Sequence, residues 1–490
     1  MSATTVADLV VDGLKRAGTP RVFAVAARGD RRVLDAARAG GLAVTLVTNE
    51  LAACVMAGVT GDLVDAPGAV LVGDDVAGPT RALEMLDGAP LIVVTRDHPS
   101  AVPGCKETLG VEVASAAHRI AHAARLAMTG PRGPVHLDIG SGIASAAAVP
   151  LATSCRPDPP PYPEGGSLDR VARALSSASR PLLLAGLHCL SAEAVQWLRA
   201  FAEALPAPLL STLRAKGALP DPHPLALGVL GVHGVEERLL SRADLLVALG
   251  LDTREADALP ETFWSSAPML VLGPAAAPDR RVPSDHVVGD VSAIIEELAV
   301  RLRDKPRADW DVAELDRLRR EGAARGAGDG LFARVVRLAR EATPAGTIAA
   351  VDASPYRAGV ITAWHAIAPR EFLASSGREK GFALPAAIAA QLVRPARRVV
   401  CFTDPEQLEA VARELETAVR LAAGVVVIVY EVAGTDGSMT VRLAEKAGLP
   451  AVAVESEVTF AQALGRALTT AGPALIVVRS SPIPASRNRV

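Results

Sequence analysis

Three acidic residues of this sequence each follow a run of residues with the composition of a β-strand. Glu50 comes directly after one such run and begins a helix that Asn49 can cap, while Asp404 and Glu431 come after two later runs. Open parallel sheets bind ligands beyond the carboxyl ends of their strands. We therefore expect these carboxylates at ligand-binding edges, where a carboxylate can transfer a proton or bind magnesium.

Each carboxylate also has an explanation that needs no ligand. A glutamate in the first turn of a helix, as Glu50 is, stabilises the helix through its dipole. Asp404, Pro405 and Gln407 fit a capping box, with the aspartate as the N-cap, the proline at the first helical position and the glutamine at the third. Glu431 is equally compatible with a solvated position at the end of a strand. The residues alone leave both explanations open.

Glycines precede a predicted helix of small residues in the segment 375–387. Gly377 and Gly381 permit the backbone to approach a ligand closely, and the alanines that follow permit equally close packing against another helix. Among the nine histidines, His98 is the most suggestive because it stands beside Asp97 at the end of a strand. We expect a structural role for it.

The elements that must position these residues alternate between strands and helices. A proline-rich stretch at 155–163 and a charged stretch at 301–325 divide the chain into three blocks. The predicted domains span 1–155, 165–300 and 325–490. The predicted strands span 21–26, 43–47, 68–72, 90–95 and 134–139, then 181–185, 207–211, 243–249 and 268–272, then 347–352, 398–403, 424–430, 450–454 and 473–478. This alternation predicts the α/β class, with three doubly wound domains built on parallel sheets.

Composition narrows the kinds of function. The chain has 490 residues, of which 50% are hydrophobic and 21% charged, so extended disorder is excluded for most of its length. A net charge of -3 gives no electrostatic support to nucleic-acid binding. The apolar runs have the length of strands and not of membrane helices, and the five cysteines have no paired spacing. We expect a cytoplasmic protein without a disulfide framework or a zinc site.

Taken in chain order, these segments resemble the thiamine-diphosphate-dependent enzymes of the acetolactate synthase and 2-oxo acid decarboxylase type. The likeness to the family's pyrimidine-binding domain rests on VADLVVDGLKRAGTPRVFAV, NELAACVMAGVTG, APLIVVT and GPVHLDI. The likeness to its central domain rests on RPLLLAG, RAKGALPDPHPLALGVLG and RADLLVALG. The likeness to its diphosphate-binding domain rests on SSGREKGFALPAAIAAQLVRP, RRVVCFTD and ELETAVRLAAGVVVIV. The resemblance covers nearly the whole chain.

The resemblance implies thiamine diphosphate as the cofactor and a 2-oxo acid as the substrate of a lyase or transferase. Glu50 matches the family's glutamate, which bonds to the aminopyrimidine ring and drives formation of the reactive carbanion. Asp404 and Glu431 would hold magnesium. The cofactor-binding residues that the resemblance implies are Gly377, Gly381, Phe382, Thr403 and Asp404. Because the family's cofactor lies between two subunits, we also expect a homodimer or a homotetramer.

The sequence departs from the family's pattern at the cofactor motif. Where the family has Gly-Asp-Gly, this chain has Thr403, Asp404 and Pro405, and Tyr430 and Glu431 stand where the family has an asparagine pair. Proline removes a backbone N–H that could hold a phosphate, which disfavours a diphosphate there. Two loops are shorter than in the family. They are Gly73–Pro79, in place of a Gly-Pro-Gly turn, and Ala433–Gly437.

Two functions follow from these observations. The first is an acetolactate-synthase-like enzyme that acts on a 2-oxo acid with thiamine diphosphate and magnesium. The second is a non-catalytic relative that serves as a binding or regulatory subunit. A nucleotide-binding oxidoreductase is disfavoured, because no Gly-x-Gly-x-x-Gly turn follows a predicted strand. The central domain stays compatible with an adenine nucleotide, although no residue points to specific contacts.

Overall fold

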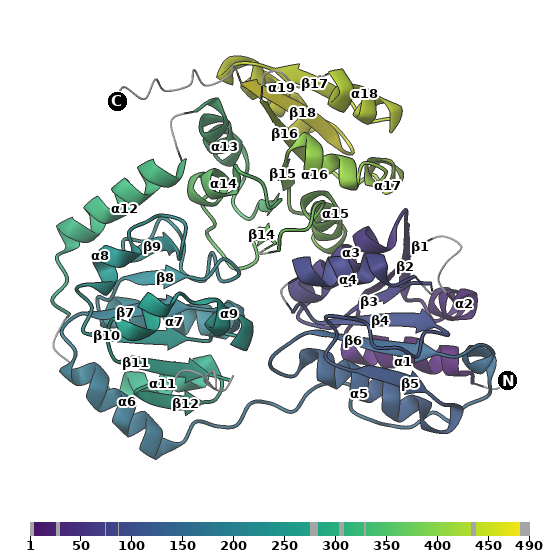
Figure 1. The fold of residues 1–490 in the computed structure, drawn as a ribbon, viewed down its shortest axis with the longest axis horizontal. Helices are drawn as coiled ribbons and strands as arrows, with labels where there is room; N and C mark the ends of the chain where they lie inside the picture. Colours follow the sequence, from purple (N-terminus) through teal and green to yellow (C-terminus); the bar gives the residue numbers. More distant parts are fainter. Residues whose placement is uncertain are drawn as a thin grey trace.

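Three six-stranded parallel sheets, each with helices on both faces, make up the computed structural model (Figure 1). The three domains stand at the corners of a triangle, with the first at the lower right, the central one at the left and the third at the top of the view. The structure describes residues 4–25, 30–73, 75–86, 88–274, 283–302, 308–327, 330–375, 377–432 and 438–480. The predicted fold class is confirmed.

The first domain has the strand order β2-β1-β3-β4-β6-β5. Its strands are β1 (Arg21–Val25), β2 (Ala43–Val47), β3 (Gly68–Leu71), β4 (Leu91–Arg96), β5 (Thr108–Val111) and β6 (Pro134–Ile139). Its helices are α1 (Val6–Ala17), α2 (Arg31–Ala39), α3 (Glu50–Val64), α4 (Ala77–Met85) and α5 (Ala116–Met128). The side chains of α3 and α4 pack on one face of the sheet, and those of α1, α2 and α5 pack on the other. Thr5 begins α1 with a capping box.

The central domain has the strand order β12-β11-β10-β7-β8-β9. Its strands are β7 (Pro181–Ala185), β8 (Leu209–Ser211), β9 (Ala226–Val229), β10 (Leu245–Leu249), β11 (Met269–Gly273) and β12 (Asp285–Val288). One face is covered by α6 (Gly165–Ser177), α7 (Ala192–Ala204) and α11 (Val291–Arg301). The other is covered by α8 (Glu236–Leu240), α9 (Thr253–Ala258), α10 (Glu261–Ser265) and α12 (Val312–Ala327).

The third domain has the strand order β14-β13-β15-β16-β18-β17. Its strands are β13 (Ile348–Val351), β14 (Phe372–Ala374), β15 (Val399–Thr403), β16 (Val425–Val432), β17 (Ala451–Val454) and β18 (Ala474–Ser480). One face is covered by α15 (Ala383–Val393), α16 (Pro405–Ala410), α17 (Glu414–Arg420) and α18 (Ser438–Lys446). The other is covered by α13 (Leu331–Ala342), α14 (Arg357–Ala363) and α19 (Glu457–Thr469).

Helices α3 and α15 join the first and third domains through one continuous hydrophobic core. Small residues are frequent in both helices, alanine in α15 and alanine and glycine in α3, and most of their residues are buried. Small side chains let two helices approach closely and still fill the space between them. The edge that carries Glu50 is therefore fixed against the third domain of the same chain.

Two predictions about elements were inaccurate. The helix expected from Pro405 to Leu415 ends at Ala410, and a second helix begins at Glu414. The short edge strands β5, β9, β12 and β14 were not predicted, because each pairs with only one neighbour and carries a weak hydrophobic pattern. The boundaries of the three predicted domains stay predictions.

Helix α3 packs closely on strand β3 at Gly68. A Cβ atom at Gly68 would lie 1.9 Å from the carbonyl oxygen of Ala57, which is backbone and cannot move aside easily. Gly68→Ala should therefore lower the stability of the protein by about 3 kcal/mol, the upper end of typical overpacking costs. Gly110 is the matched control, because it also lies in a strand and a Cβ atom there would meet nothing within 4 Å. The midpoints of urea unfolding measure the effect, and equal midpoints for Gly68→Ala and Gly110→Ala would contradict it.

Candidate functional site

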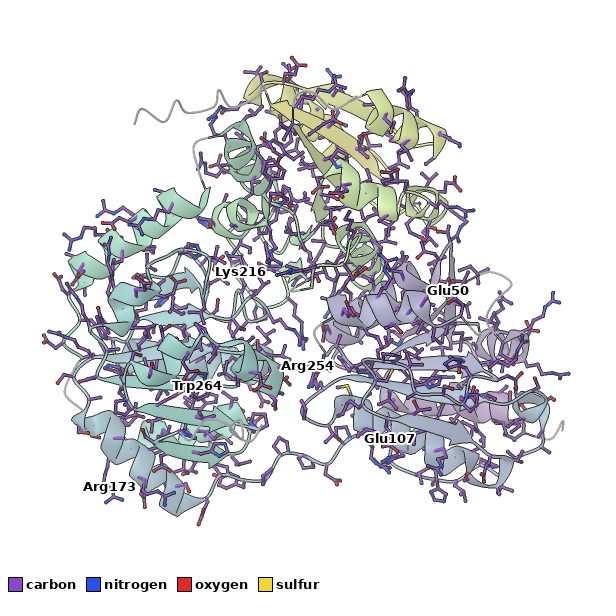
Figure 2. All side chains as sticks on the ribbon, in the orientation of Figure 1. Glu50, Glu107, Arg173, Lys216, Arg254 and Trp264 are labelled. Atoms are coloured by element: carbon purple, nitrogen blue, oxygen red, sulfur yellow. The ribbon has the colours of Figure 1, made fainter. Side chains whose placement is uncertain are left out.

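Glu50 is the first residue of α3, and its side chain is buried. The helix begins there because Asn49 has extended backbone geometry and its Oδ1 accepts a hydrogen bond from the N–H of Ala52 at 2.8 Å. Gly78 lies so close that a Cβ atom there would be 2.9 Å from the Cβ of Glu50. Figure 2 shows Glu50 on the side of the first domain that faces the third. The carboxylate thus lies in a confined position at the carboxyl edge of the first sheet.

The third domain holds the loop that leads into Glu50. Glu414 begins α17 and is 0% exposed, and its Oε1 accepts hydrogen bonds from the N–H of Thr48 at 3.1 Å and from the Thr48 hydroxyl. Its Oε2 has no hydrogen-bond partner in the described part of the chain. Arg420, at the other end of α17, donates to the carbonyl of Leu46. Sequence analysis missed Glu414, because its partner is far away in the sequence.

Asp404 and Gln407 close the carboxyl edge of the third sheet with their own hydrogen bonds. Asp404 directly follows β15 and caps α16, since its Oδ1 accepts from the N–H of Gln407 at 3.0 Å. The Gln407 side chain accepts from the N–H of Gly381 at 3.0 Å and donates to the carbonyl of Ala353 at 3.3 Å. Only half of the predicted capping box is present, because the glutamine side chain bridges these two backbone groups and does not return to the N-cap.

The side chain of Asp352 lies at the amino terminus of α15, the helix that follows the glycine-rich segment. Its Oδ1 accepts from the N–H groups of Phe382 and Ala383, both at 2.8 Å, and its Oδ2 accepts from the hydroxyl of Thr403 at 2.6 Å. Burial raises the pKa of Asp352 to about 6, although these three hydrogen bonds oppose the shift. Two predicted cofactor-binding residues, Phe382 and Thr403, are therefore bonded to a carboxylate of the protein itself. Sequence analysis missed Asp352, which ends the predicted strand 347–352.

Glu431 lies in β16, is 3% exposed and forms an ion pair with Arg479, whose Nε is 3.2 Å from its Oε2. The hydroxyl of Thr440 lies 3.4 Å from its Oε1. It is thus neither solvated nor placed beside other ligand side chains. Within the described residues, no group of three or more histidine, cysteine, aspartate or glutamate side chains could hold a metal ion.

The two predicted glycines serve close approaches of the backbone. A Cβ atom at Gly377 would lie 2.6 Å from the carbonyl oxygen of Glu84 in the first domain. Gly381 has φ +90°, and a Cβ atom there would lie 2.7 Å from the side chain of Val411. Of the two shortened loops, residues 433–437 and Asp74 lie outside the described residues.

His98 belongs to a buried polar cluster in the first domain. Its N–H donates to Oδ1 of Asp138 at 2.8 Å, and the same oxygen accepts from the Thr95 hydroxyl at 3.0 Å. That hydroxyl also lies 2.7 Å from Nε2 of His136, whose pKa is lowered to about 4 by burial. Thr95 is 1% and His136 0% exposed, so these two side chains are out of reach of a substrate. These contacts agree with the structural role expected for His98.

Comparison with known proteins places the three domains in one family. Three family models match, described as thiamine pyrophosphate enzyme, N-terminal TPP binding domain (residues 4–117), central domain (168–298) and C-terminal TPP binding domain (357–435). The chain is 29% identical to the acetolactate synthase isozyme 1 large subunit of Escherichia coli over 362 residues, which cover 68% of this chain and 64% of that subunit. It is 27% identical to the catabolic acetolactate synthase of Raoultella terrigena over 465 residues, 86% of this chain and 82% of the relative.

A solved structure shares the fold over the whole chain. It is the X-ray structure of a Mycobacterium smegmatis protein assigned provisionally to the thiamin diphosphate-dependent enzymes. The TM-score is 0.79 at 20% identity, and the match covers 98% of this chain and 100% of the other. The alignment with the Escherichia coli subunit, by contrast, spans less than two thirds of that subunit.

The described side chains fit only half of thiamine diphosphate. Glu50 is a buried carboxylate beside a glycine, which suits a flat nitrogen heterocycle that bonds to it. The other half, a magnesium-bound diphosphate, needs N–H donors and free carboxylates at the edge of the third sheet. There Pro405 has no N–H, Asp404 and Gln407 are bonded to backbone groups, and Glu406 adds a negative charge that pairs with Lys380. These residues do not fit magnesium diphosphate in this conformation.

The raised pKa of Asp352 predicts a stability that depends on pH. Its folded-state value of about 6 lies above the ordinary 3.8, so the stability that the neutral side chain contributes is present below pH 4 and lost as the pH rises through 6. Asp352→Asn keeps an uncharged oxygen acceptor and has no such loss. Relative to this variant, the wild type should lose about 3 kcal/mol between roughly pH 4 and pH 7, from two pKa units at about 1.4 kcal/mol each.

Urea unfolding of both proteins at several pH values measures this difference. Asp257→Asn is the control, because Asp257 is an exposed residue of α9 and its replacement should leave the pH profile unchanged. Parallel profiles for wild type and Asp352→Asn would show that Asp352 is ionised throughout this range.

Proposed function

Because the chain belongs to the thiamine pyrophosphate enzyme family, of the acetolactate synthase type, we propose that it is an acetolactate-synthase-like enzyme acting on a 2-oxo acid. The observation that carries this proposal is the position of Glu50. It is a buried carboxylate at the carboxyl edge of the first sheet, inside the matched N-terminal TPP binding domain, and its loop is fixed from two sides. The reaction class is that of a lyase or transferase.

The proposed cofactor is thiamine diphosphate, which supplies an electron sink for breaking or forming a bond at the carbonyl carbon of a 2-oxo acid. In this chain, Glu50 would hold the aminopyrimidine ring of that cofactor through its buried carboxylate and would carry the proton needed there. Asn49 caps the first turn of the helix that carries Glu50, and Glu414 accepts a hydrogen bond from Thr48, two residues before Glu50. Gly78 leaves room for the ring only as long as no side chain is added there.

Magnesium, assembly and location complete the proposal. The ligands for magnesium would be Asp404 and Glu431, and each must first give up a bond, to Gln407 and Arg479 respectively. A homodimer or a homotetramer in the cytoplasm is the proposed form, without a nucleic-acid or membrane partner. Among the described residues, no helix has the length and apolar character needed to cross a bilayer.

A second function is favoured by a different observation, the closed edge of the third sheet. A chain in which Gln407 and Asp352 already satisfy the polar groups of that edge can keep its fold and bind no cofactor. It would then serve as a binding or regulatory subunit. The two functions differ in whether thiamine diphosphate binds.

Calorimetric titration of thiamine diphosphate with magnesium into the purified protein separates them. For the enzyme, we expect weak binding to wild type, tighter binding to Gln407→Ala, since the bridging side chain is removed, and none to Asp404→Ala. Asp257→Asn, an exposed change in the central domain, should bind as wild type does. No binding to wild type or to Gln407→Ala would establish the second function as the better description.

Replacement of Glu50 tests the proposed activity directly. Glu50→Gln keeps the size of the side chain and removes its proton exchange, so turnover of a 2-oxo acid such as pyruvate should fall by at least about 100-fold. Release of carbon dioxide measures the rate, and circular dichroism checks that the fold is intact. Glu112→Gln, an exposed change in the same domain, should leave the rate unchanged. An unchanged rate in Glu50→Gln would remove the proposed role of Glu50.

A further inference from the structure

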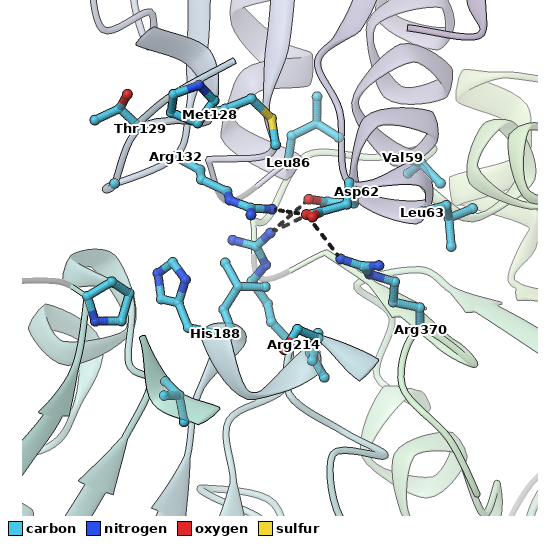
Figure 3. Close-up of a pocket in the computed structure, with 18 of the residues that line it drawn as sticks. Val59, Asp62, Leu63, Leu86, Met128, Thr129, Arg132, His188, Arg214 and Arg370 are labelled. Carbon is cyan, nitrogen blue, oxygen red and sulfur yellow. Dashed lines mark hydrogen bonds and ion pairs between the residues drawn. The ribbon is translucent and has the colours of Figure 1, made fainter. Parts of the chain in front are cut away.

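A cavity of about 610 Å³ lies where the three domains meet. Its wall is made by the carboxyl end of α3, the loop after α5, the linker between the first two domains, the carboxyl ends of central strands and the start of the third-domain strand β14. Figure 3 shows the polar side chains of this wall converging on the end of α3. The volume is in the range of sites for small molecules.

Each domain contributes one arginine to this wall. Arg132 of the first domain lies 2.6 Å from Oδ1 of Asp65, and Arg370 of the third domain lies 3.5 Å from the same oxygen. Arg214 of the central domain contacts both carboxylate oxygens of Asp62, at 3.3 and 3.4 Å. Three guanidinium groups thus surround two carboxylates, and the contact of Arg370 is long for charged partners.

The backbone is left-handed at both ends of the contact between Asp65 and Arg370. Asp65, with φ 57°, is the cap that ends α3, where this conformation is common, whereas Arg370, with φ 61°, adopts it in a loop, where residues other than glycine rarely do. Such conformations persist only where the surrounding structure enforces them, and they are concentrated at ligand clamps. Asp65 is also accessible, with 55% of its side chain exposed. Although burial opposes the shift, Arg132 holds the pKa of Asp65 below its ordinary value.

A second pair of polar groups stands beside the arginines. His188 lines the cavity, and its Nε2 lies 3.8 Å from Oδ2 of Asp252, which is 2% exposed. Within the described residues, neither of these atoms has a hydrogen-bond partner. Two further aspartates line the cavity. Asp290 caps α11, and Asp158 is an exposed residue of the linker.

The central-domain side of the cavity does not favour a nucleotide. At the end of β7, where an open sheet would present N–H groups to a phosphate, the N–H of Leu187 donates to Oε2 of Glu255 at 2.9 Å. The other oxygen of Glu255 accepts from the hydroxyl of Thr212 at 2.5 Å. A carboxylate in this position repels a phosphate group. The positively charged groups of the cavity wall are instead Arg132, Arg214 and Arg370.

We propose that this cavity binds a small carboxylate anion between Arg132, Arg370 and Arg214, and that Asp65 occupies the anion position when no ligand is bound. Guanidinium groups bind carboxylates in a paired geometry, which the long contact of Arg370 leaves incompletely used. The ligand carboxylate would displace Asp65, whose side chain can turn into solvent. Because the ligand contacts all three domains, its binding also stabilises their arrangement. This inference does not depend on the proposed reaction.

Asp65→Asn should change the affinity for a carboxylate in the direction opposite to the one expected from a structural defect. Removal of the competing internal carboxylate should strengthen the binding of malonate by about tenfold, whereas a merely structural role for Asp65 predicts weaker binding. Asparagine tolerates the left-handed conformation, so the backbone is kept. Calorimetry at low ionic strength, without thiamine diphosphate, measures the affinity. Weaker binding in this variant, or no malonate binding to either protein, would overturn the proposal.

Replacement of the arginines tests the other side of the site. Arg370→Gln and Arg132→Gln should each weaken malonate binding by at least about tenfold, as expected for the loss of a charge-assisted hydrogen bond. Arg173→Gln is the matched control, because Arg173 is exposed on α6 and lies away from the cavity (Figure 2), and it should bind as wild type does. Arg370→Lys keeps the charge and should recover part of the affinity even if Arg370→Gln folds poorly.

Two further ligands define the chemistry of the site. Malonamide has the shape of malonate without its charge and should not bind. Inorganic phosphate should bind more weakly than malonate, because the N–H groups of Leu187, Ser292 and Ala293 on the central-domain side already donate to the carboxylates of Glu255 and Asp290. Equal binding of malonamide, or tighter binding of phosphate, would contradict the assignment of a carboxylate ligand.

Discussion

The close packing of α3 against α15 is the constraint on which the rest of this structure depends. Alanine-rich faces let these two helices share one core, so the first and third domains are fixed to each other within a single chain. Two contacts follow from that approach. Glu414 accepts a hydrogen bond from the N–H of Thr48. Gly377 lies so close to the backbone of Glu84 that no side chain would fit there. The position of Glu50 is therefore a consequence of packing far from its own carboxylate.

The edge of the third sheet is closed by side chains of the protein itself. Buried N–H and carbonyl groups at such an edge must find partners, and a bound ligand is one way to supply them. Here side chains supply them, because Gln407 bridges Gly381 and Ala353 and Asp352 receives Phe382 and Ala383. The edge is thus stable without a ligand. This arrangement places the carboxyl group of Asp352 in a buried position, and burial raises its pKa.

Sequence reasoning reached the fold and the beginnings of helices more readily than the partners of side chains. Strand composition and alternation predicted three α/β domains, and Asn49 and Asp404 cap their helices as expected, because these signals are local. The partner of Gln407 was predicted wrongly. A glutamine at the third position of a helix usually returns to the N-cap, and only the three-dimensional position of Gly381 decides otherwise. Asp352 and Glu414 were missed for the same reason, since their partners are distant in the sequence.

Two aspartates of this chain stand in positions where a ligand anion could be held, and they differ in how easily they could be replaced. Asp352 is 1% exposed and makes three short hydrogen bonds, so displacing it would leave several buried donors without partners. Asp65 is half exposed and shares one oxygen between two arginines. Displacement there exposes no buried donor, because the incoming anion takes over the guanidinium groups. The hydrogen bonds of Asp352 therefore close the edge of the third sheet to an anion. In the three-domain cavity, by contrast, the anion position is held by Asp65, which a ligand can replace.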